Sequence, residues 1–329
     1  MAMDRPMNAA DRTVICTLGM HRSGTSLVSR ILNLLGVYLG AAPAISGAGS
    51  DNPKGHWEHH PIALLNDDIL VRYGGRWDVP PAFPPDWTRD AGLIPLKEEA
   101  ARLLTDAFGS HELWGWKDPR TCLTAAFWQD LVGPMRYVLC VRNPLAVAAS
   151  LERRDRMLAI HADRLWLLYV AASLIHSRGY PRIVVFYEDL MADWPRELRR
   201  LAAFIGRPDR AEDPEVTAAV SDFIAGDLHH HRPSSEDLAA DTNLSFETKS
   251  LYLALRAARG ALVEGSAELE WLAVQAVASA QRLDAIHVAQ AALAADHAAQ
   301  AAAISQLTRS RDELTASVAR LTAAGDEVT

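Results

Sequence analysis

The segment TVICTLGMHRSGTSL, residues 13–27, decides the fold of this chain. Residues 13–18 are an apolar, β-rich run, which predicts a buried strand. Gly19 and Gly24 follow the run, and the hydroxyl pair Thr25 and Ser26 opens a pattern typical of an amphipathic helix. A strand, a glycine-containing turn and a helix start turn backbone N–H groups toward an anion. The segment therefore predicts a phosphate-binding loop at the end of the first strand.

The loop differs from the nucleotide-triphosphate pattern G-x-x-x-x-G-K-[ST] at one important position. Thr25 stands where that pattern has lysine, and the cation is Arg22, inside the loop. An ATPase without the lysine would lose its hold on the β- and γ-phosphates. The loop therefore favours a nucleotide with a different group on its 5′-phosphate, one that needs a cation beside the bridging oxygen.

Two further segments place charged residues after short apolar runs. In RYVLCVRNPLAVAASL, residues 136–151, the run ends at Arg142, and Ser150 lies eight positions later. Asn143 suits a helix cap and the proline after it suits the first turn, so this is a strand–helix junction. In LWGWKDPRT, residues 113–121, the run is followed by Lys117 and Asp118.

Together these motifs resemble those of the sulfotransferases that use 3′-phosphoadenosine 5′-phosphosulfate (PAPS). In that family the phosphosulfate loop reads roughly [KR]-[SG]-G-[ST]-[ST] after a hydrophobic strand, and the resemblance covers about residues 12–233. It implies transfer of a sulfuryl group from PAPS to an acceptor hydroxyl, with release of 3′-phosphoadenosine 5′-phosphate (PAP). The implied 3′-phosphate ligands are Arg142 and Ser150. The implied phosphosulfate ligands are Arg22, Ser23, Gly24, Thr25 and Ser26.

The resemblance extends to candidate catalytic residues. The Lys117-Asp-Pro-x-Thr segment resembles one in protein-tyrosine sulfotransferases, where the lysine points at the reacting sulfate. In the alternative interpretation, Asp118 or Thr121 caps the following helix and the lysine is solvated.

The general base is sought in DNPKGHWEHHP, residues 51–61, which resembles a segment of bacterial members of the family. Glu58 is the first candidate and His56 the second. We expect burial against Trp57 to raise the pKa of Glu58 toward neutrality, as suits a base. The alternative is that Glu58 lies in the first turn of a helix, where the helix dipole favours a carboxylate.

Composition limits the class of protein. The 329 residues are 49% hydrophobic, enough to bury a large core, and the net charge of −8 argues against a nucleic-acid binder. No apolar run reaches the roughly 20 residues of a membrane span, and the first eleven residues lack a hydrophobic signal core.

The three cysteines form no C-x-x-C pair and are expected to be buried thiols in a reducing, cytoplasmic compartment. Histidines at 56–60 and 229–231 have no spacing that suits a metal site, so no metal is expected.

Periodicity predicts an α/β fold: a P-loop-like parallel sheet flanked by helices on both faces. Strands are predicted at residues 13–18, 113–116, 137–141 and 182–187. Helices are predicted at residues 25–35, 62–73, 96–108, 121–131, 144–152, 158–177 and 195–205. The proline- and tryptophan-containing residues 74–95 are expected to form a loop over the acceptor pocket. A segment at 187–190 is interpreted as structural, helping to terminate the last strand.

The predicted organisation is a flexible N-terminus at 1–11, a sulfotransferase α/β domain at 12–260 and a helical, coiled-coil-like extension at 261–329. Ile304, Leu307, Leu314, Val318 and Leu321 follow three- and four-residue steps interrupted by Arg311, which indicates a seam for a partner helix or a second copy through 265–324. The acceptor is expected to be a carbohydrate or another small metabolite. Two alternatives remain: a P-loop kinase-like phosphotransferase, and a non-catalytic nucleotide-binding coiled-coil scaffold.

Overall fold

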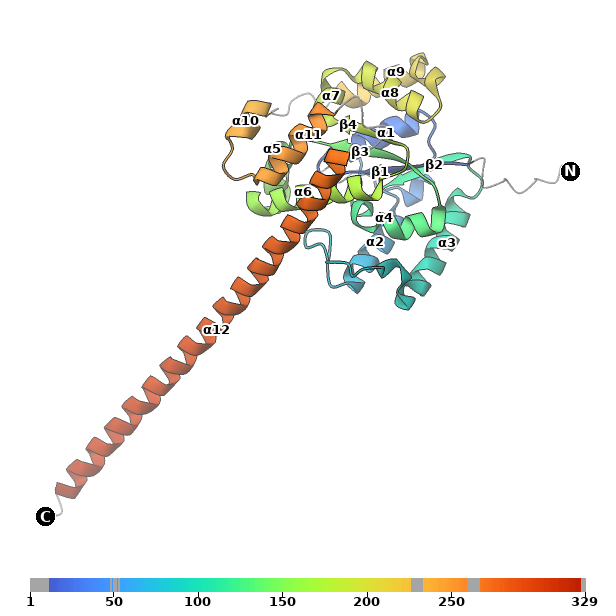
Figure 1. The fold of residues 1–329 in the computed structure, drawn as a ribbon. Coiled ribbons are helices and arrows are strands. Elements are labelled where there is room, and N and C mark those ends of the chain that lie inside the picture. Colours follow the sequence, from blue (N-terminus) through green and yellow to red (C-terminus); the bar gives the residue numbers. More distant parts are fainter. Residues whose placement is uncertain are drawn as a thin grey trace. The chain divides into compact units, whose positions relative to one another are not determined.

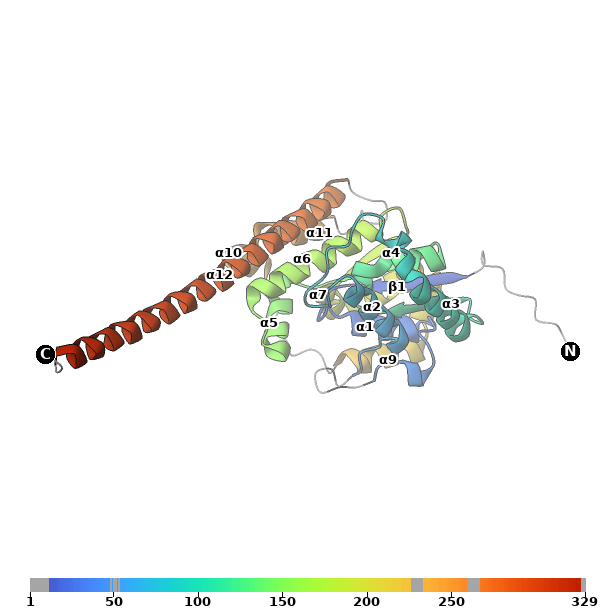
Figure 2. The same cartoon turned by 90° about the horizontal axis from the view of Figure 1, so that it is seen from below.

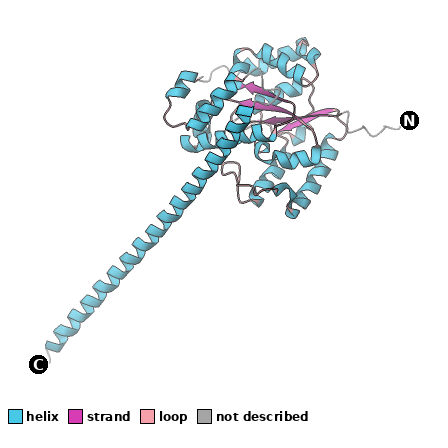
Figure 3. Cartoon of the chain, viewed as in Figure 1, coloured by secondary structure: helices cyan, strands magenta, loops and turns pink. Residues whose placement is uncertain are grey.

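A four-stranded parallel sheet forms the centre of the fold (Figure 1, Figure 3). The computed structural model describes residues 12–47, 49, 52, 54–225, 233–258 and 267–326. The sheet order is β2-β1-β3-β4. Its strands are β1 (Thr13–Leu18), β2 (Leu113–Lys117), β3 (Arg136–Val141) and β4 (Arg182–Phe186). The predicted α/β class and parallel sheet are confirmed.

Almost every strand residue is buried, as expected of a parallel sheet with helices on both faces. One face packs against α1 (Thr25–Leu34), α8 (Trp194–Phe204) and α9 (Pro214–Ala225), which share a hydrophobic cluster with β1, β3 and β4. Below the sheet in Figure 1 lie α4 (Thr121–Val132) and α6 (Ala159–His176). Figure 2 shows α5 (Pro144–Asp155) beside α6.

The sequence patterns do not predict four helices of the α/β unit, at residues 187–192, 214–225, 235–240 and 246–257. Seven predicted helices are found within a few residues of their expected bounds. Tyr187, expected to end the last strand, instead begins a short helix. The remaining helices are α2 (His60–Arg72), α3 (Ile94–Phe108), α7 (Tyr187–Ala192), α10 (Ser235–Ala240) and α11 (Phe246–Ala257).

A 60-residue helix, α12 (Ala267–Asp326), confirms the predicted long C-terminal helix. The compact unit that holds the sheet extends to Ala278, and a second unit begins at Ser279. Within the first unit Leu269 and Ala273 are buried, and Glu270 forms ion pairs with Arg178 at 2.9 Å and with Arg182 at 3.6 Å. In the second unit several apolar side chains are exposed: Leu293, Ile304, Leu307 and Leu314. Pairing through this helix stays a prediction.

The three cysteines lie in the interior of the protein. Cys16, Cys122 and Cys140 are buried and free, and burial raises the pKa of the Cys122 thiol to about 12, so the predicted buried thiols are confirmed. Among the helices that the structure describes, none is long and apolar enough to cross a membrane.

Candidate active site

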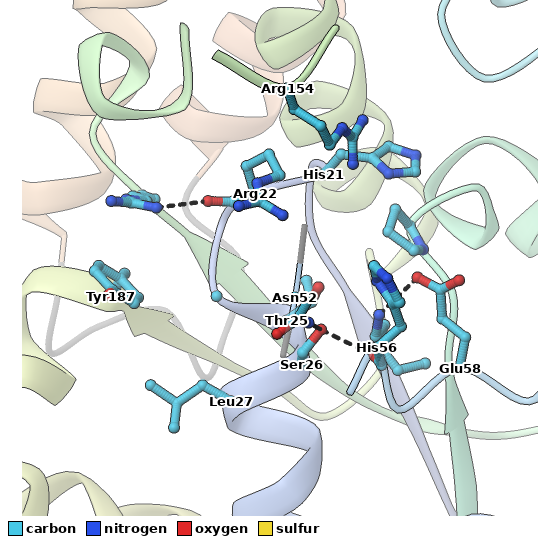
Figure 4. A pocket seen from close by; sticks show the side chains of 14 residues that line it. His21, Arg22, Thr25, Ser26, Leu27, Asn52, His56, Glu58, Arg154 and Tyr187 are labelled. Atoms are coloured by element: carbon cyan, nitrogen blue, oxygen red, sulfur yellow. Dashed lines mark hydrogen bonds and ion pairs between the residues drawn. The ribbon is translucent and has the colours of Figure 1, made fainter. Parts of the chain in front are cut away.

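The pocket lies at the carboxyl ends of the strands, where open α/β sheets bind ligands. It has a volume of about 140 Å³ and is lined by residues that follow all four strands, together with residues from 52–58 (Figure 4). Its lining brings together most of the predicted site residues: Arg22, Gly24, Thr25, Ser26, His56, Glu58, Lys117 and Arg142. The predicted ligands Ser23 and Ser150 are buried and do not line the pocket.

The loop between β1 and α1, predicted to bind phosphate, contains two residues in the left-handed backbone conformation. Arg22 has φ 68° and Gly24 has φ 82°. A Cβ atom on Gly24 would come within 2.5 Å of the Tyr187 ring, so the position requires glycine for both conformation and space. The helical hydrogen bonds of α1 begin with Val28 N–H donating to Gly24 O, which leaves the N–H groups of the first turn outside the ladder. The start of α1 is therefore suited to an anion.

Ser23 differs from its predicted role. Its backbone N–H, expected to hold the 5′-phosphate, donates to Met20 O at 3.1 Å and closes the turn. Its side chain is buried, with 1% exposure. The left-handed conformation of Arg22 folds the loop back on itself, and in this structure the Ser23 N–H is used to support the turn rather than to face the pocket.

Residues predicted for opposite ends of the cofactor contact one another. Arg22 Nε donates to Ser150 Oγ at 2.9 Å, and Arg142 Nη1 donates to the carbonyl oxygen of Arg22 at 3.0 Å. The Arg142 guanidinium also lies over the Tyr187 ring, 4.3 Å from its centroid. The predicted phosphosulfate loop and the predicted 3′-phosphate ligands therefore form one connected cluster.

Lys117 and Glu58 form a buried ion pair. Lys117 Nζ lies 2.7 Å from Glu58 Oε1, and the two side chains are 2% and 16% exposed. Lys117 is thus not solvated, which rules out one alternative for it. No side-chain cap is found at the start of α4, so neither Asp118 nor Thr121 caps that helix. Glu58 precedes α2 and does not lie in its first turn, so the alternative interpretation of Glu58 is also wrong.

The expected rise in the pKa of Glu58 is wrong. Burial is the largest effect and raises this pKa, but the charge and the hydrogen bond of Lys117, together with the charge of Arg120 and a smaller effect of another neighbour, outweigh it, and the net shift is downward. Trp57 does not supply the apolar wall. Its Nε1 donates to Lys54 O at 2.9 Å, and its ring lies against Arg30, 4.7 Å from the guanidinium carbon. Glu58 is therefore held as a carboxylate by its cationic neighbours.

The segment that carries Glu58 is attached to the start of α1. Ser26 Oγ donates to the His56 carbonyl oxygen at 2.9 Å. Asn52 Nδ2 donates to Ser26 Oγ at 3.3 Å and to Gly55 O at 2.6 Å. Figure 4 shows Asn52, Ser26 and His56 close together on one side of the pocket. Both candidate bases, His56 and Glu58, are consequently fixed next to the phosphate-binding loop.

Among the pocket residues that the sequence interpretation does not select, three carry a basic or aromatic side chain: His21, Arg154 and Tyr187. The His21 ring lies 4.5 Å from that of Trp77, within the loop expected over the acceptor pocket. Burial, followed by the charges of Arg120 and Arg154, holds the pKa of His21 well below its usual value, so the imidazole is neutral. Tyr187 lies in the segment 187–190, which the sequence interpretation assigns to termination of the last strand. No periodic signal marks any of the three.

The His229–His231 run lies outside the described residues. Within the part of the chain that the structure describes, no group of three or more histidine, cysteine or acidic side chains is arranged to hold a metal ion.

Comparisons with known proteins give structural similarity at low identity. No protein-family model and no curated protein matches the chain. The chain is 15% identical to a sulfotransferase from Mycobacterium avium (TM-score 0.46, covering 77% of this chain and 79% of that one). It is 16% identical to the sulfotransferase domain of the Synechococcus olefin synthase (TM-score 0.40, covering 82% and 94%). It is 14% identical to a retinol dehydratase solved with retinol and PAP (TM-score 0.32, covering 77% and 71%).

Proposed function

We propose that this chain is a sulfotransferase that moves a sulfuryl group from PAPS to an acceptor hydroxyl and releases PAP. One observation carries the proposal: a single pocket at the carboxyl edge of the sheet gathers Arg22, Glu58, Lys117 and Arg142 around the start of α1. Arg22, Lys117 and Arg142 are selected in the sequence by the phosphosulfate-loop pattern and the two later motifs, and Glu58 is selected by the segment 51–61.

The nucleotide would bind through both of its phosphate-bearing ends. The N–H groups of Gly24, Thr25 and Ser26 at the start of α1 would hold the 5′-phosphate. Arg142 and Ser150 would bind the 3′-phosphate, with charge-assisted hydrogen bonds from the guanidinium. Ser150 Oγ accepts from Arg22 Nε and keeps its own O–H as a donor, so it could bind a phosphate while it still contacts Arg22.

The chemical step would join the acceptor oxygen to sulfur while the bond from sulfur to the bridging oxygen of the 5′-phosphate breaks. The electron pair of that bond stays on PAP, and the hydroxyl proton passes to the base. Lys117 and Arg22 would stabilise the charge that grows on the bridging oxygen. The transferred sulfuryl group carries less negative charge than a γ-phosphoryl group, so cationic side chains are proposed to replace the metal of kinases.

Glu58 is the proposed base and His56 the second candidate. The lowered pKa of Glu58 keeps it ionised, as a proton acceptor must be, but the ion pair with Lys117 weakens its basicity. If Lys117 turns toward the reacting sulfate, Glu58 loses its closest cation and becomes a stronger base when the acceptor is in place. A carbohydrate or another small hydroxyl compound is the proposed acceptor.

Ligand binding and turnover test the proposal separately. PAP is expected to raise the melting temperature, whereas ATP, which lacks a 3′-phosphate, is expected to do little. A screen of hydroxyl compounds with labelled PAPS then identifies the acceptor. Equal stabilisation by ATP would favour the kinase-like alternative. PAP binding without transfer to any acceptor or to water would favour the non-catalytic scaffold.

A further inference from the structure

The side-chain amide of Asn66, on α2, makes four hydrogen bonds in the interior of the protein. Its Nδ2 donates to Asp118 Oδ2 at 2.6 Å and to Thr121 Oγ1 at 3.0 Å. Its Oδ1 accepts from Thr124 Oγ1 at 2.6 Å and from Trp128 Nε1 at 2.8 Å. A primary amide has two donor hydrogens and two lone pairs, so the hydrogen-bonding capacity of Asn66 is fully used.

All four partners belong to the segment that follows Lys117. Asp118 is adjacent to Lys117, and the other three lie in α4. The Asp118 carboxylate, which is fully buried, also accepts from Arg120 Nη1 at 2.6 Å. Arg120 Nε in turn pairs with Asp67, the residue after Asn66, at 2.7 Å. Two successive residues of α2 therefore hold the turn after β2.

This network joins the two chain segments that carry the Lys117–Glu58 ion pair. Glu58 lies two residues before the first residue of α2, and Lys117 is the last residue of β2. The Asn66 side chain does not line the pocket. It can therefore affect the reaction only through the relative position of α2 and the end of β2.

Burial alone does not explain this arrangement. A buried amide contributes no more to stability than a well-packed apolar group unless all of its hydrogen bonds form, and a buried polar network with one missing member is costly. Directional hydrogen bonds fix a geometry more narrowly than apolar contacts do. The place where such fixation matters is the neighbouring ion pair, where a shift of about 1 Å in a reacting group can cost about 10²-fold in rate.

We propose that Asn66 is a positioning residue for sulfuryl transfer. Its hydrogen bonds to Asp118 and to α4 fix the position of Lys117 relative to Glu58. The proposal rests on the proposed function, because its consequence is measured on the transfer step. Asn66 contacts neither the predicted nucleotide ligands nor the pocket, so nucleotide affinity should not depend on it.

The test replaces the amide by an isosteric carboxylate, Asn66→Asp, which removes both donors and opposes Asp118. The matched control is Gln129→Glu. Gln129 is a half-buried amide on α4, and its Nε2 donates to Tyr137 Oη at 2.8 Å and to His176 O at 2.6 Å, away from the ion pair. Both variants should lose thermal stability. Only Asn66→Asp should lower kcat, by about 10- to 100-fold, with the Kd of PAP unchanged.

A double-mutant cycle with Lys117→Met separates positioning from general destabilisation. If Asn66 acts through the ion pair, adding Asn66→Asp to Lys117→Met should lower kcat less than twofold further. Thr124→Val, which removes one donor to Asn66 Oδ1, is the milder variant if Asn66→Asp does not fold. It should show a smaller loss in kcat with the same non-additivity.

The outcomes distinguish this proposal from the function on which it rests. A wild-type protein that transfers no sulfuryl group overturns both. A wild type that turns over, with equal kcat losses in Asn66→Asp and Gln129→Glu or with losses that multiply in the cycle, overturns the positioning role alone.

Discussion

Lys117 Nζ and Glu58 Oε1 lie 2.7 Å apart in a nearly buried ion pair beside the loop that is predicted to bind phosphate. In this pair the proposed base, Glu58, contacts Lys117, which is proposed to stabilise the charge that develops in the reaction. Its strength decides how basic Glu58 is, because Lys117 is the largest of the influences that lower the pKa of this carboxyl, whereas burial raises it.

Removal of Lys117 should therefore move the pH profile as well as the rate. In Lys117→Met the burial effect that raises the pKa of Glu58 remains while its main cationic neighbour is lost. The pKa of Glu58 should rise, and since the base acts when deprotonated, the acid limb of kcat/KM should move to higher pH. The pH profile of kcat/KM from pH 4 to 9 measures this. An acid limb that stays in place would show that Glu58 does not control it.

Substitution of the base should cost much of the rate. Glu58→Gln keeps shape and hydrogen bonding but removes basicity, so we expect kcat to fall by about 10²- to 10⁴-fold with PAP affinity retained. His56→Ala is the comparison, since His56 also lines the pocket. If His56→Ala shows the large loss and Glu58→Gln does not, the base is His56.

Nucleotide affinity should depend on Arg142. Arg142→Ala removes the proposed ligand of the 3′-phosphate and should weaken PAP binding by about 1.5–3 kcal/mol, the usual contribution of a hydrogen bond to a charged group. Binding of PAP and of adenosine 5′-phosphosulfate, measured by calorimetry, separates the two ends of the nucleotide. The exposed Arg199 on α8 supplies the control Arg199→Ala. The same loss of affinity for both ligands would place the 3′-phosphate elsewhere.

The loop should not tolerate a side chain at Gly24. Gly24→Ala combines a left-handed φ of 82° with a contact of 2.5 Å to the Tyr187 ring. We expect a loss in stability of about 1–3 kcal/mol and a further loss of PAP binding, because Tyr187 also packs against Arg142. Chemical denaturation and calorimetry measure the two effects. Wild-type values for both would contradict the described loop geometry.

Truncation tests the role of α12. A chain ending at Ala278 keeps Leu269, Ala273 and the Glu270 ion pairs, so it should fold and bind PAP. A chain ending at residue 260, the predicted domain boundary, should be less stable because Arg182, 1% exposed, loses Glu270.

Light scattering shows whether the exposed apolar residues of the longer helix cause self-association. The same number of chains per particle with and without residues 279–329 would argue against the coiled-coil prediction.

The sequence predicts the sheet and the strand, loop and helix at residues 13–34 well because both rest on local patterns. All four strands were expected within one or two residues, since buried parallel strands are continuous apolar runs bounded by charged or turn residues. The family motifs place Arg22, Lys117 and Arg142 in one pocket because parallel strands end at the same edge.

What the sequence does not predict depends on contacts between distant segments. The pKa of Glu58 was expected to rise because Trp57 is its neighbour in sequence, but the tryptophan packs on Arg30 while Lys117, 59 residues away, pairs with the carboxylate. In the sequence Asn66 is one polar residue of a predicted helix and belongs to no motif, yet its four hydrogen-bond partners lie 52 to 62 residues away. Tyr187 becomes a pocket residue only because α7 begins where the strand was expected to continue.

The most direct test of the central claim is transfer of label from ³⁵S-labelled PAPS to a panel of hydroxyl compounds, with water as the default acceptor. The wild-type protein, Lys117→Met and Arg22→Ala are compared at equal concentrations of PAP-binding sites. The account predicts transfer by the wild type, with formation of PAP and losses in kcat larger than any change in the KM for PAPS in both variants. No labelled product and no sulfate release above the uncatalysed rate, from a folded protein that binds PAP, would contradict it.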